Sequence, residues 1–150
     1  EKSPRTVDNF LYNYVDSGFY EQTVFHFVEQ GYLIAGGGYT SDLQEKQART
    51  PIPCEANNGL SNQRGTVAMA RHPDFAHSAT SQFFINLVDN PSLDYRPAED
   101  ETVNGYCVFG DVTEGMETVD KIAGAAVRDR GDFVKTPREP IVIESISRVK

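Results

Sequence analysis

Short β-favouring runs, separated by turn residues, dominate the chain after its first twenty residues. They are rich in Val, Ile, Phe, Tyr and Thr and are bounded by Gly, Pro, Asn or Asp, as is typical of strands joined by turns. Many short strands with two helices predict a mainly β fold, an antiparallel β-barrel that is closed or nearly closed and capped by two α-helices. The predicted strands are Thr23–Val28, Tyr32–Gly36, Val67–Ala70, Gln82–Leu87, Tyr106–Val112 and Ile141–Val149.

Two segments carry helical periodicity. The first can be capped by Ser3 or Thr6 and closed by Gly18, because hydroxyl side chains favour helix starts and glycine favours helix ends. The second is expected from about Glu114 to Ala123. The apolar residues that share one face of the first helix are Val7, Phe10, Leu11, Tyr14 and Val15.

Composition and charge limit the partners. The 150 residues suit a single domain over 1–150, and no apolar run approaches the roughly 20 residues that span a bilayer. A net charge of −8 disfavours phosphate backbones and anionic lipid surfaces. We therefore expect a soluble protein with no nucleic acid or membrane partner, while the compartment and oligomeric state stay open. Cys54 and Cys107 are expected to be unpaired thiols, with a disulfide as the alternative.

The usual signs of covalent or metal chemistry are missing. Gly36-Gly37-Gly38 is not followed by the GK[ST] of a phosphate loop, and we expect it to allow close backbone packing instead. The chain's histidines, His26, His72 and His77, lack metal-ligand spacing with one another, and no serine elbow accompanies them. No metal and no cofactor is predicted.

Two long loops stand out, Thr40–Ser61 and Asp89–Gly105, and loops of such length are often functional. The second contains the acidic run Glu99-Asp100-Glu101, which is expected to be solvated. The sequence leaves open whether Pro97–Val103 selects partners.

Four ordered segments resemble the sequence blocks of cyclophilins, and the order and spacing of the segments agree with that family over essentially the whole chain, most closely in the style of its bacterial members. The segments are Phe25–Thr40, with His26 and the run GYLIAGGGYT, then Asn58–Ala70, Ser78–Asn86 with SQFFIN, and Gly105–Gly110. The resemblance implies peptidyl-prolyl cis-trans isomerase activity, a reaction that needs no base, nucleophile or metal because no covalent bond is made or broken. Its partners would be proline-containing peptides or proteins.

The resemblance also implies roles for individual residues. Phe84, Leu33, Leu93 and Tyr32 correspond to the family's proline pocket, and Tyr106 to its rim. The residues that correspond to its contacts with the flanking peptide are Gln82, Met69, Ala70 and Arg71.

Two positions depart from the family pattern. Phe27 stands where the family has its catalytic arginine, and Ala35 stands where a glutamine orients that arginine and touches substrate. Since one aimed donor contributes about 10²–10³ in rate, reduced activity is expected, unless Arg71 or Arg64 replaces the donor. The alternative is a non-catalytic proline-peptide binding module, or a scaffold domain whose pocket Phe27 blocks. Ser92 lies where relatives carry a large aromatic ring, which argues against strong cyclosporin binding.

The resemblance also bears on the start of the fold. Relatives have a two-stranded hairpin before their first helix, whereas this sequence begins at the helix. Six strands instead of eight would leave open sheet edges. We expect either that the natural domain includes the missing pair or that another segment covers these edges.

Overall fold

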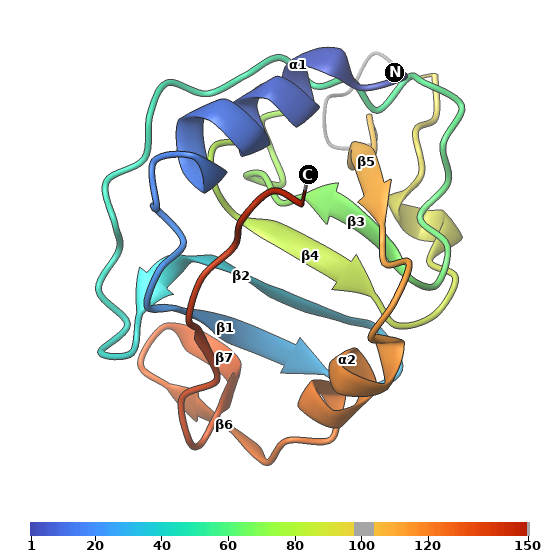
Figure 1. Ribbon diagram of the computed structural model, residues 1–150. Helices are drawn as coiled ribbons and strands as arrows, with labels where there is room; N and C mark the ends of the chain where they lie inside the picture. The colour runs from blue at the N-terminus through green and yellow to red at the C-terminus, as the bar shows by residue number, and fades with distance from the viewer. Residues whose placement is uncertain (98–103, 150) are drawn as a thin grey trace.

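A six-stranded antiparallel sheet forms the centre of the molecule (Figure 1). The computed structural model describes residues 1–97 and 104–149, so the acidic run 99–101 lies outside the described residues. The strands are β1 (Thr23–Glu29), β2 (Leu33–Thr40), β3 (Thr66–Met69), β4 (Phe83–Asn86), β5 (Val108–Asp111) and β8 (Val142–Ile143). They lie in the order β5-β3-β4-β2-β1-β8. The predicted mainly β, antiparallel class is confirmed.

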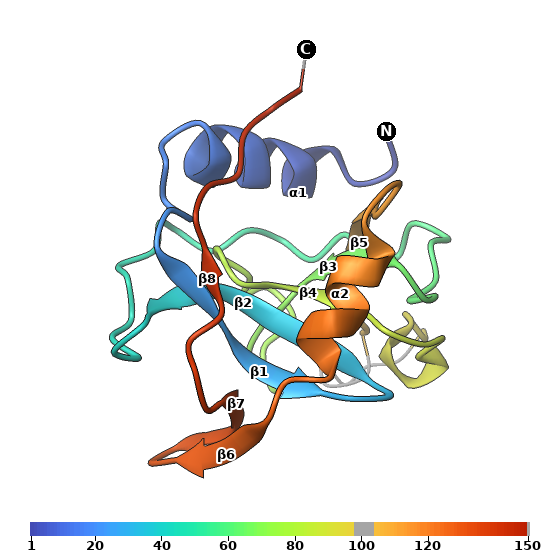
Figure 2. The ribbon, with the colours of Figure 1, turned by 60° about the horizontal axis from the view of Figure 1, so that its bottom comes forward.

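A second, smaller sheet is present that was not predicted from the sequence. It consists of β6 (Val127–Arg130) and β7 (Phe133–Pro137), which form an antiparallel hairpin. The hairpin lies beyond β1 at one end of the molecule (Figures 1 and 2). Its turn is Gly131-Asp132, with Gly131 at φ +61° and Arg130 paired with Phe133. A Gly-Asp pair between two short runs is a hairpin signal, so the sequence did contain the information.

The glycine run extends β2 beyond its predicted end. The predicted strand stopped at Gly36, but the structure continues it to Thr40. Gly37 has φ +89°, and a Cβ there would lie 2.8 Å from the Tyr20 ring and 2.9 Å from that of Phe83. A Cβ on Gly38 would lie 2.5 Å from the Gln82 side chain. The prediction that these glycines allow close packing is confirmed.

The last predicted strand is too long. Only Val142 and Ile143 of the predicted 141–149 segment pair with β1. The remainder packs through side chains: Ile146 lies against the core, and Arg148 forms an ion pair with Asp16 and lies over the ring of Tyr12. Side-chain contacts, without a backbone ladder, therefore hold this end of the chain.

Both predicted helices are present. The first consists of α1 (Pro4–Asp8) and the π-helical turn η1 (Asn9–Val15), and the second is α2 (Met116–Ala123). In Figure 1 the first helix lies at the top of the view, and α2 lies near the bottom, next to the ends of β1 and β2. None of the helices in the described residues is long and apolar enough to cross a membrane.

The start of the first helix is capped by a residue that the sequence analysis did not consider. Ser3 occupies the cap position, but its hydroxyl donates to the carbonyl of Val108, 2.8 Å away. The Glu55 carboxylate instead accepts hydrogen bonds from the backbone N–H and the hydroxyl of Thr6, both at 2.7 Å. An acid from the long loop after β2 thus satisfies the orphan N–H groups of the first turn.

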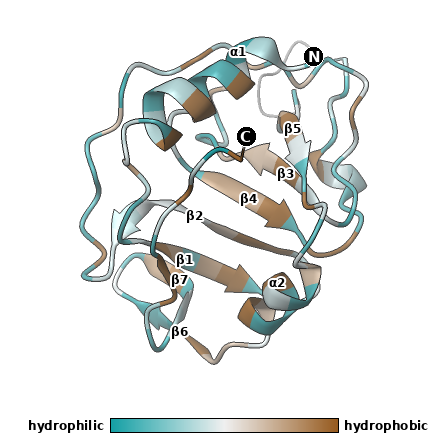
Figure 3. Ribbon diagram, in the orientation of Figure 1, coloured by the Kyte–Doolittle hydropathy of each residue, from teal (hydrophilic) through white to brown (hydrophobic). Residues whose placement is uncertain are grey.

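One face of the sheet packs against both helices. Tyr14 and Val15 of η1 lie against Met69 and Phe83, while Val119 and Ala123 of α2 lie against strands β1 and β2. Phe25 contacts both clusters and joins them into one core. Figure 3 shows the central strands β1 and β4 as largely hydrophobic. The opposite face of the sheet is therefore available for a site.

The two cysteines are free, as predicted. Cys107 is buried, and its Sγ lies 3.5 Å from the hydroxyls of both Ser3 and Thr6. Burial raises the pKa of this thiol, which keeps it protonated and unreactive.

Replacing Glu55 with alanine is expected to destabilise the fold. The substitution leaves the N–H of Thr6 without its acceptor, and the loss of a helix cap costs about 1 kcal/mol. Urea unfolding should show this loss in the free energy of unfolding. The control variant Glu139→Ala, at an exposed site, should leave it unchanged. Equal stability of both variants would contradict the capping role.

Candidate active site

A row of five cross-strand neighbours lies beneath the candidate site, and three of them, Phe27, Ala35 and Phe84, form its floor. Ala35 on β2 pairs with Phe27 on β1 and with Phe84 on β4. Ala68 on β3 pairs in turn with Phe84 and with Val108 on β5. Large and small residues alternate from Phe27 to Ala68 along this row. Directly opposed side chains in a sheet lie about 5 Å apart, so a small side chain leaves space beside a large neighbour. Phe84 therefore lies between two alanines, which leave room beside its ring.

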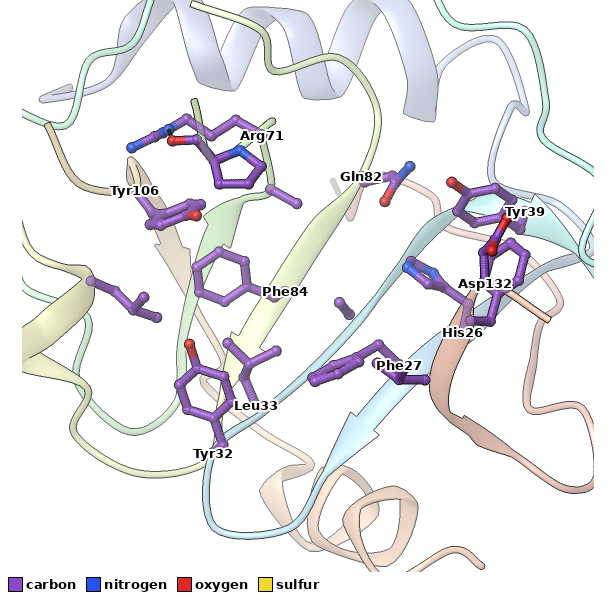
Figure 4. A pocket seen from close by; sticks show the side chains of 16 residues that line it. His26, Phe27, Tyr32, Leu33, Tyr39, Arg71, Gln82, Phe84, Tyr106 and Asp132 are labelled. Atoms are coloured by element: carbon purple, nitrogen blue, oxygen red, sulfur yellow. Dashed lines mark hydrogen bonds between the residues drawn. The ribbon is translucent and has the colours of Figure 1, made fainter. Parts of the chain in front are cut away.

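A cavity of about 710 Å³ lies over this floor (Figure 4). Ten of the eleven predicted site residues line it, and only Met69 does not. Met69 is 2% exposed and packs in the core against the first helix, so its side chain lies apart from the other predicted site residues. The ten are Phe27, Tyr32, Leu33, Ala35, Ala70, Arg71, Gln82, Phe84, Leu93 and Tyr106.

The niche around Phe84 is apolar and rigid. Phe84 is 3% exposed and Leu33 is 7% exposed, and the Tyr106 ring meets Phe84 edge-on with 5.7 Å between ring centroids. Such T-shaped contacts favour one fixed ring orientation. The niche is thus a preformed slot for a small apolar ring.

Buried asparagines hold the backbone behind the niche walls. The Asn62 amide donates to the carbonyls of Leu93 and Tyr106, at 3.1 and 3.3 Å. The Asn90 amide donates to the carbonyl of Tyr32 at 3.1 Å. The Asn86 amide donates to the side chain of Asn62 at 3.0 Å. Since buried amides are costly to leave unpaired, this network fixes three wall residues that come from distant parts of the chain.

A register shift turns two adjacent residues of β1 toward the cavity. Neighbouring residues of a regular strand point to opposite faces, yet His26 and Phe27 both line the cavity. The pairing of β1 with β2 is irregular between Phe25 and Phe27, and such bulges re-aim side chains. Figure 4 shows the Phe27 ring extending along the cavity floor and not over Phe84.

His26 is a neutral imidazole in this setting. Its ring lies against those of Tyr39 and Phe133, and its buried Nδ1 has no hydrogen-bond partner among residues 1–97 and 104–149. Burial lowers the pKa of His26 to about 4, because a charged ring would lose its hydration. At neutral pH this residue brings no positive charge to the cavity.

Neither of the two candidate arginines is aimed at the niche. Arg64 pairs with Asp120 and donates to the carbonyl of Leu87, and it does not line the cavity. Arg71 does line it, but its guanidinium donates to the carbonyls of Gly105, His72 and Pro73 and lies 4.4 Å over the Tyr106 ring. In Figure 4 Tyr106 lies between Arg71 and Phe84.

Several cavity residues were not predicted as site residues. Tyr39 and His26 both lie within the recognised Phe25–Thr40 block, but neither was predicted to line the site. The hairpin of β6 and β7 contributes three more, which the Gly131-Asp132 turn signal could have indicated. The additional lining residues are His26, Tyr39, Pro73, Asp132, Phe133 and Val134.

The family model for "Cyclophilin type peptidyl-prolyl cis-trans isomerase/CLD" matches residues 1–148. The chain belongs to this family. The match covers the six-stranded sheet, both helices and every residue that lines the cavity.

Bacterial cyclophilins are similar to it over nearly all of its length. Peptidyl-prolyl cis-trans isomerase B of Escherichia coli (strain K12) is 48% identical over 147 residues, which are 98% of this chain and 88% of that protein. Peptidyl-prolyl cis-trans isomerase A of Dickeya dadantii (strain 3937) is 45% identical over 150 residues, 100% of this chain and 76% of that protein.

A solved structure has the same fold. The cyclophilin-type isomerase of Cryptosporidium parvum, crystallised in the presence of the dipeptide Ala-Pro, superposes with a TM-score of 0.81 at 25% identity. The superposition covers 99% of this chain and 87% of that one. The mainly β assignment therefore stands on structural likeness as well as on sequence.

The buried state of His26 predicts a pH dependence of stability. Its pKa of about 4 in the folded state is below the value near 6.5 of an unfolded chain, so the unfolded state binds the proton more readily. The free energy of unfolding should therefore fall as the pH drops from about 6.5 toward 4. NMR titration of the His26 ring and urea unfolding at several pH values check this. A His26→Gln variant should lose this part of the pH dependence, and titration of His26 near 6.5 would contradict the burial argument.

Proposed function

We propose that this cyclophilin isomerises X-Pro bonds at a reduced rate, by holding the proline ring in the Phe84 niche without an arginine beside it. The observation that carries the proposal is the floor row, in which Phe84 lies between two alanines. Phe27, at the position where the family pattern has its arginine, pairs with the first of these alanines. The substrates are proline-containing peptides or protein segments.

The chemistry of the reaction suits a niche of this kind. The barrier of about 18–20 kcal/mol comes from the partial double bond of the amide, and uncatalysed exchange takes about 10–100 s. Holding the proline ring while the preceding residue rotates favours the twisted amide over both planar isomers. An apolar slot with a fixed floor supplies that hold without any acid, base or metal.

Polar contacts to the flanking peptide are also available. The side-chain amide of Gln82 lines the cavity and makes no hydrogen bond within the described part of the chain. It projects beside Gly38, where any larger residue would collide with it. An amide of this kind can donate to or accept from a peptide backbone, which favours an extended segment across the niche.

The reduced rate follows from Phe27 and Ala35. A donor aimed at the prolyl nitrogen stabilises the twisted amide, in which the nitrogen lone pair is released from conjugation, and one such donor is worth about 10²–10³ in rate. The guanidinium of Arg71 is engaged with three backbone carbonyls and Tyr106. What remains is catalysis by fixing the ring and by excluding water.

Restoring the donor is expected to raise the rate. Ala35 pairs directly with Phe27, so Phe27→Arg with Ala35→Gln would place a guanidinium next to an amide that can orient it. The double variant should exchange an Ala-Pro peptide about 10²–10³ faster than the unmodified protein, as measured by exchange NMR. Phe27→Lys with Ala35→Gln is the matched control, because lysine carries the same charge without the planar guanidinium of arginine. Equal rates for the unmodified and double-variant proteins would refute the role assigned to Phe27.

Opening the niche floor is expected to remove peptide binding. Phe84→Ala takes away the ring that the proline contacts, so chemical-shift changes on adding Ala-Pro peptide should disappear. Phe109→Ala, at a partly buried site that does not line the cavity, is the control for general loosening of the core. Shift changes without faster exchange in the unmodified protein would show a binding module without turnover, and no shift changes would show a blocked pocket.

A further inference from the structure

The cavity extends well beyond the proline niche. Figure 4 shows Phe84, Tyr106 and Tyr32 at one end, and Tyr39 and Asp132 at the other. The wall at the far end includes Asp132, Phe133 and Val134, which come from the β6–β7 hairpin. The proposed isomerase chemistry uses none of these residues.

Three aromatic rings surround the far end. The ring centroids of Tyr39 and Phe133 are 4.9 Å apart at 89°, and those of His26 and Tyr39 are 4.8 Å apart at 68°. All three rings line the cavity, and none is fully buried. Edge-on packing leaves part of a ring face open to the cavity, and such a face attracts cations through its quadrupole.

The charges at this end have one sign. Asp132 is exposed on the cavity wall and makes no ion pair within the described residues. Glu45 pairs with Tyr39 as an isolated bridge and lines the adjoining hollow together with it. A peptide that crosses this end therefore meets two carboxylates beside aromatic faces.

Nearby positive charges are neutralised or face elsewhere. Lys135 of the same hairpin pairs with Glu29, and Arg130 lines a separate hollow with Val24. His26 is neutral at physiological pH because burial lowers its pKa to about 4. Phe27 contributes an apolar ring to the stretch between the two ends. Arg71 lines both the cavity and the adjoining hollow, but its guanidinium lies over the Tyr106 ring at the opposite end of the cavity.

We propose that the end of the cavity formed by Asp132, Tyr39 and Phe133 binds the basic side chain of a residue close to the isomerised proline. This cation subsite, as we call it, rests on the proposed function, since it requires the proline to occupy the Phe84 niche. It makes lysine- or arginine-bearing proline segments the substrate class of this cyclophilin. The aliphatic stem of such a side chain packs on the rings, and its charged end meets the Asp132 carboxylate.

A charge scan of a peptide tests the subsite. The host is a short alanine-rich peptide with one proline, in which lysine, norleucine or glutamate is placed in turn at each position on either side of the proline. Norleucine keeps the stem of lysine and lacks its charge. Affinity is measured by NMR titration at low and at physiological ionic strength. At one or two positions the lysine peptide should bind about 5-fold more tightly than the norleucine peptide, and less so with added salt.

Variants locate the effect in the hairpin. Asp132→Asn and Phe133→Leu should each reduce the lysine preference, while Asp132→Lys should reverse it in favour of glutamate. The matched control is Asp129→Asn, which removes a charge from the same hairpin away from the cavity and keeps the oxygen that accepts from the N–H of Lys135. The lysine preference should survive in this control.

The outcomes separate the subsite from the proposed function. If the neutral host binds and depends on Phe84, but lysine gives no preference at any position, the subsite is refuted and the proposed function stands. A lysine preference that persists in Asp132→Lys also refutes the subsite. If the neutral host does not bind at all, the proposed function and the subsite fall together.

Discussion

The pairing of Ala35 with both Phe27 and Phe84 is the constraint on which the whole cavity depends. A slip of one residue in β4 would turn Phe84 into the core and Phe83 outward, because side chains alternate along a strand. Phe83 is held inward by rings of the first helix and of Tyr20. The packing of Phe83 in the core on one face thus sets the register of Phe84 in the floor on the other. Gly37 and Gly38 of β2 leave the space that the Tyr20, Phe83 and Gln82 side chains occupy.

Much of the fold could be predicted from the sequence because its strands and helices carry strong local patterns. Residues 23–29 and 83–86 are rich in β-branched and aromatic residues, and the helices have clear apolar faces. The failures lie where tertiary contacts decide. The 141–149 segment has a strand-like composition but pairs over only two residues, and the cap of the first helix comes from Glu55, far away in the sequence. The β6–β7 hairpin was missed although its Gly-Asp turn was visible.

The candidate site shows the same division. Ten of the eleven positions predicted from the resemblance to cyclophilins line the cavity, because those residues lie in recognisable blocks. The Met69 side chain lies in the core instead, as alternation along β3 predicts for the residue between Ala68 and Ala70. His26 could not have been found by alternation, since only the irregular pairing near Phe25 brings it to the same face as Phe27. Asp132 belongs to a hairpin that meets the cavity only through tertiary folding.

The alanine between the two phenylalanines also has a pharmacological consequence. Ala35 lines the cavity next to Phe84, and its methyl group takes less space than the glutamine of the family pattern. An inhibitor whose proline analogue bears an added methyl or phenyl group on the side toward Ala35 would fit here and collide with a glutamine in relatives that carry one. Selectivity against a cyclophilin that carries the glutamine would then rest on shape alone.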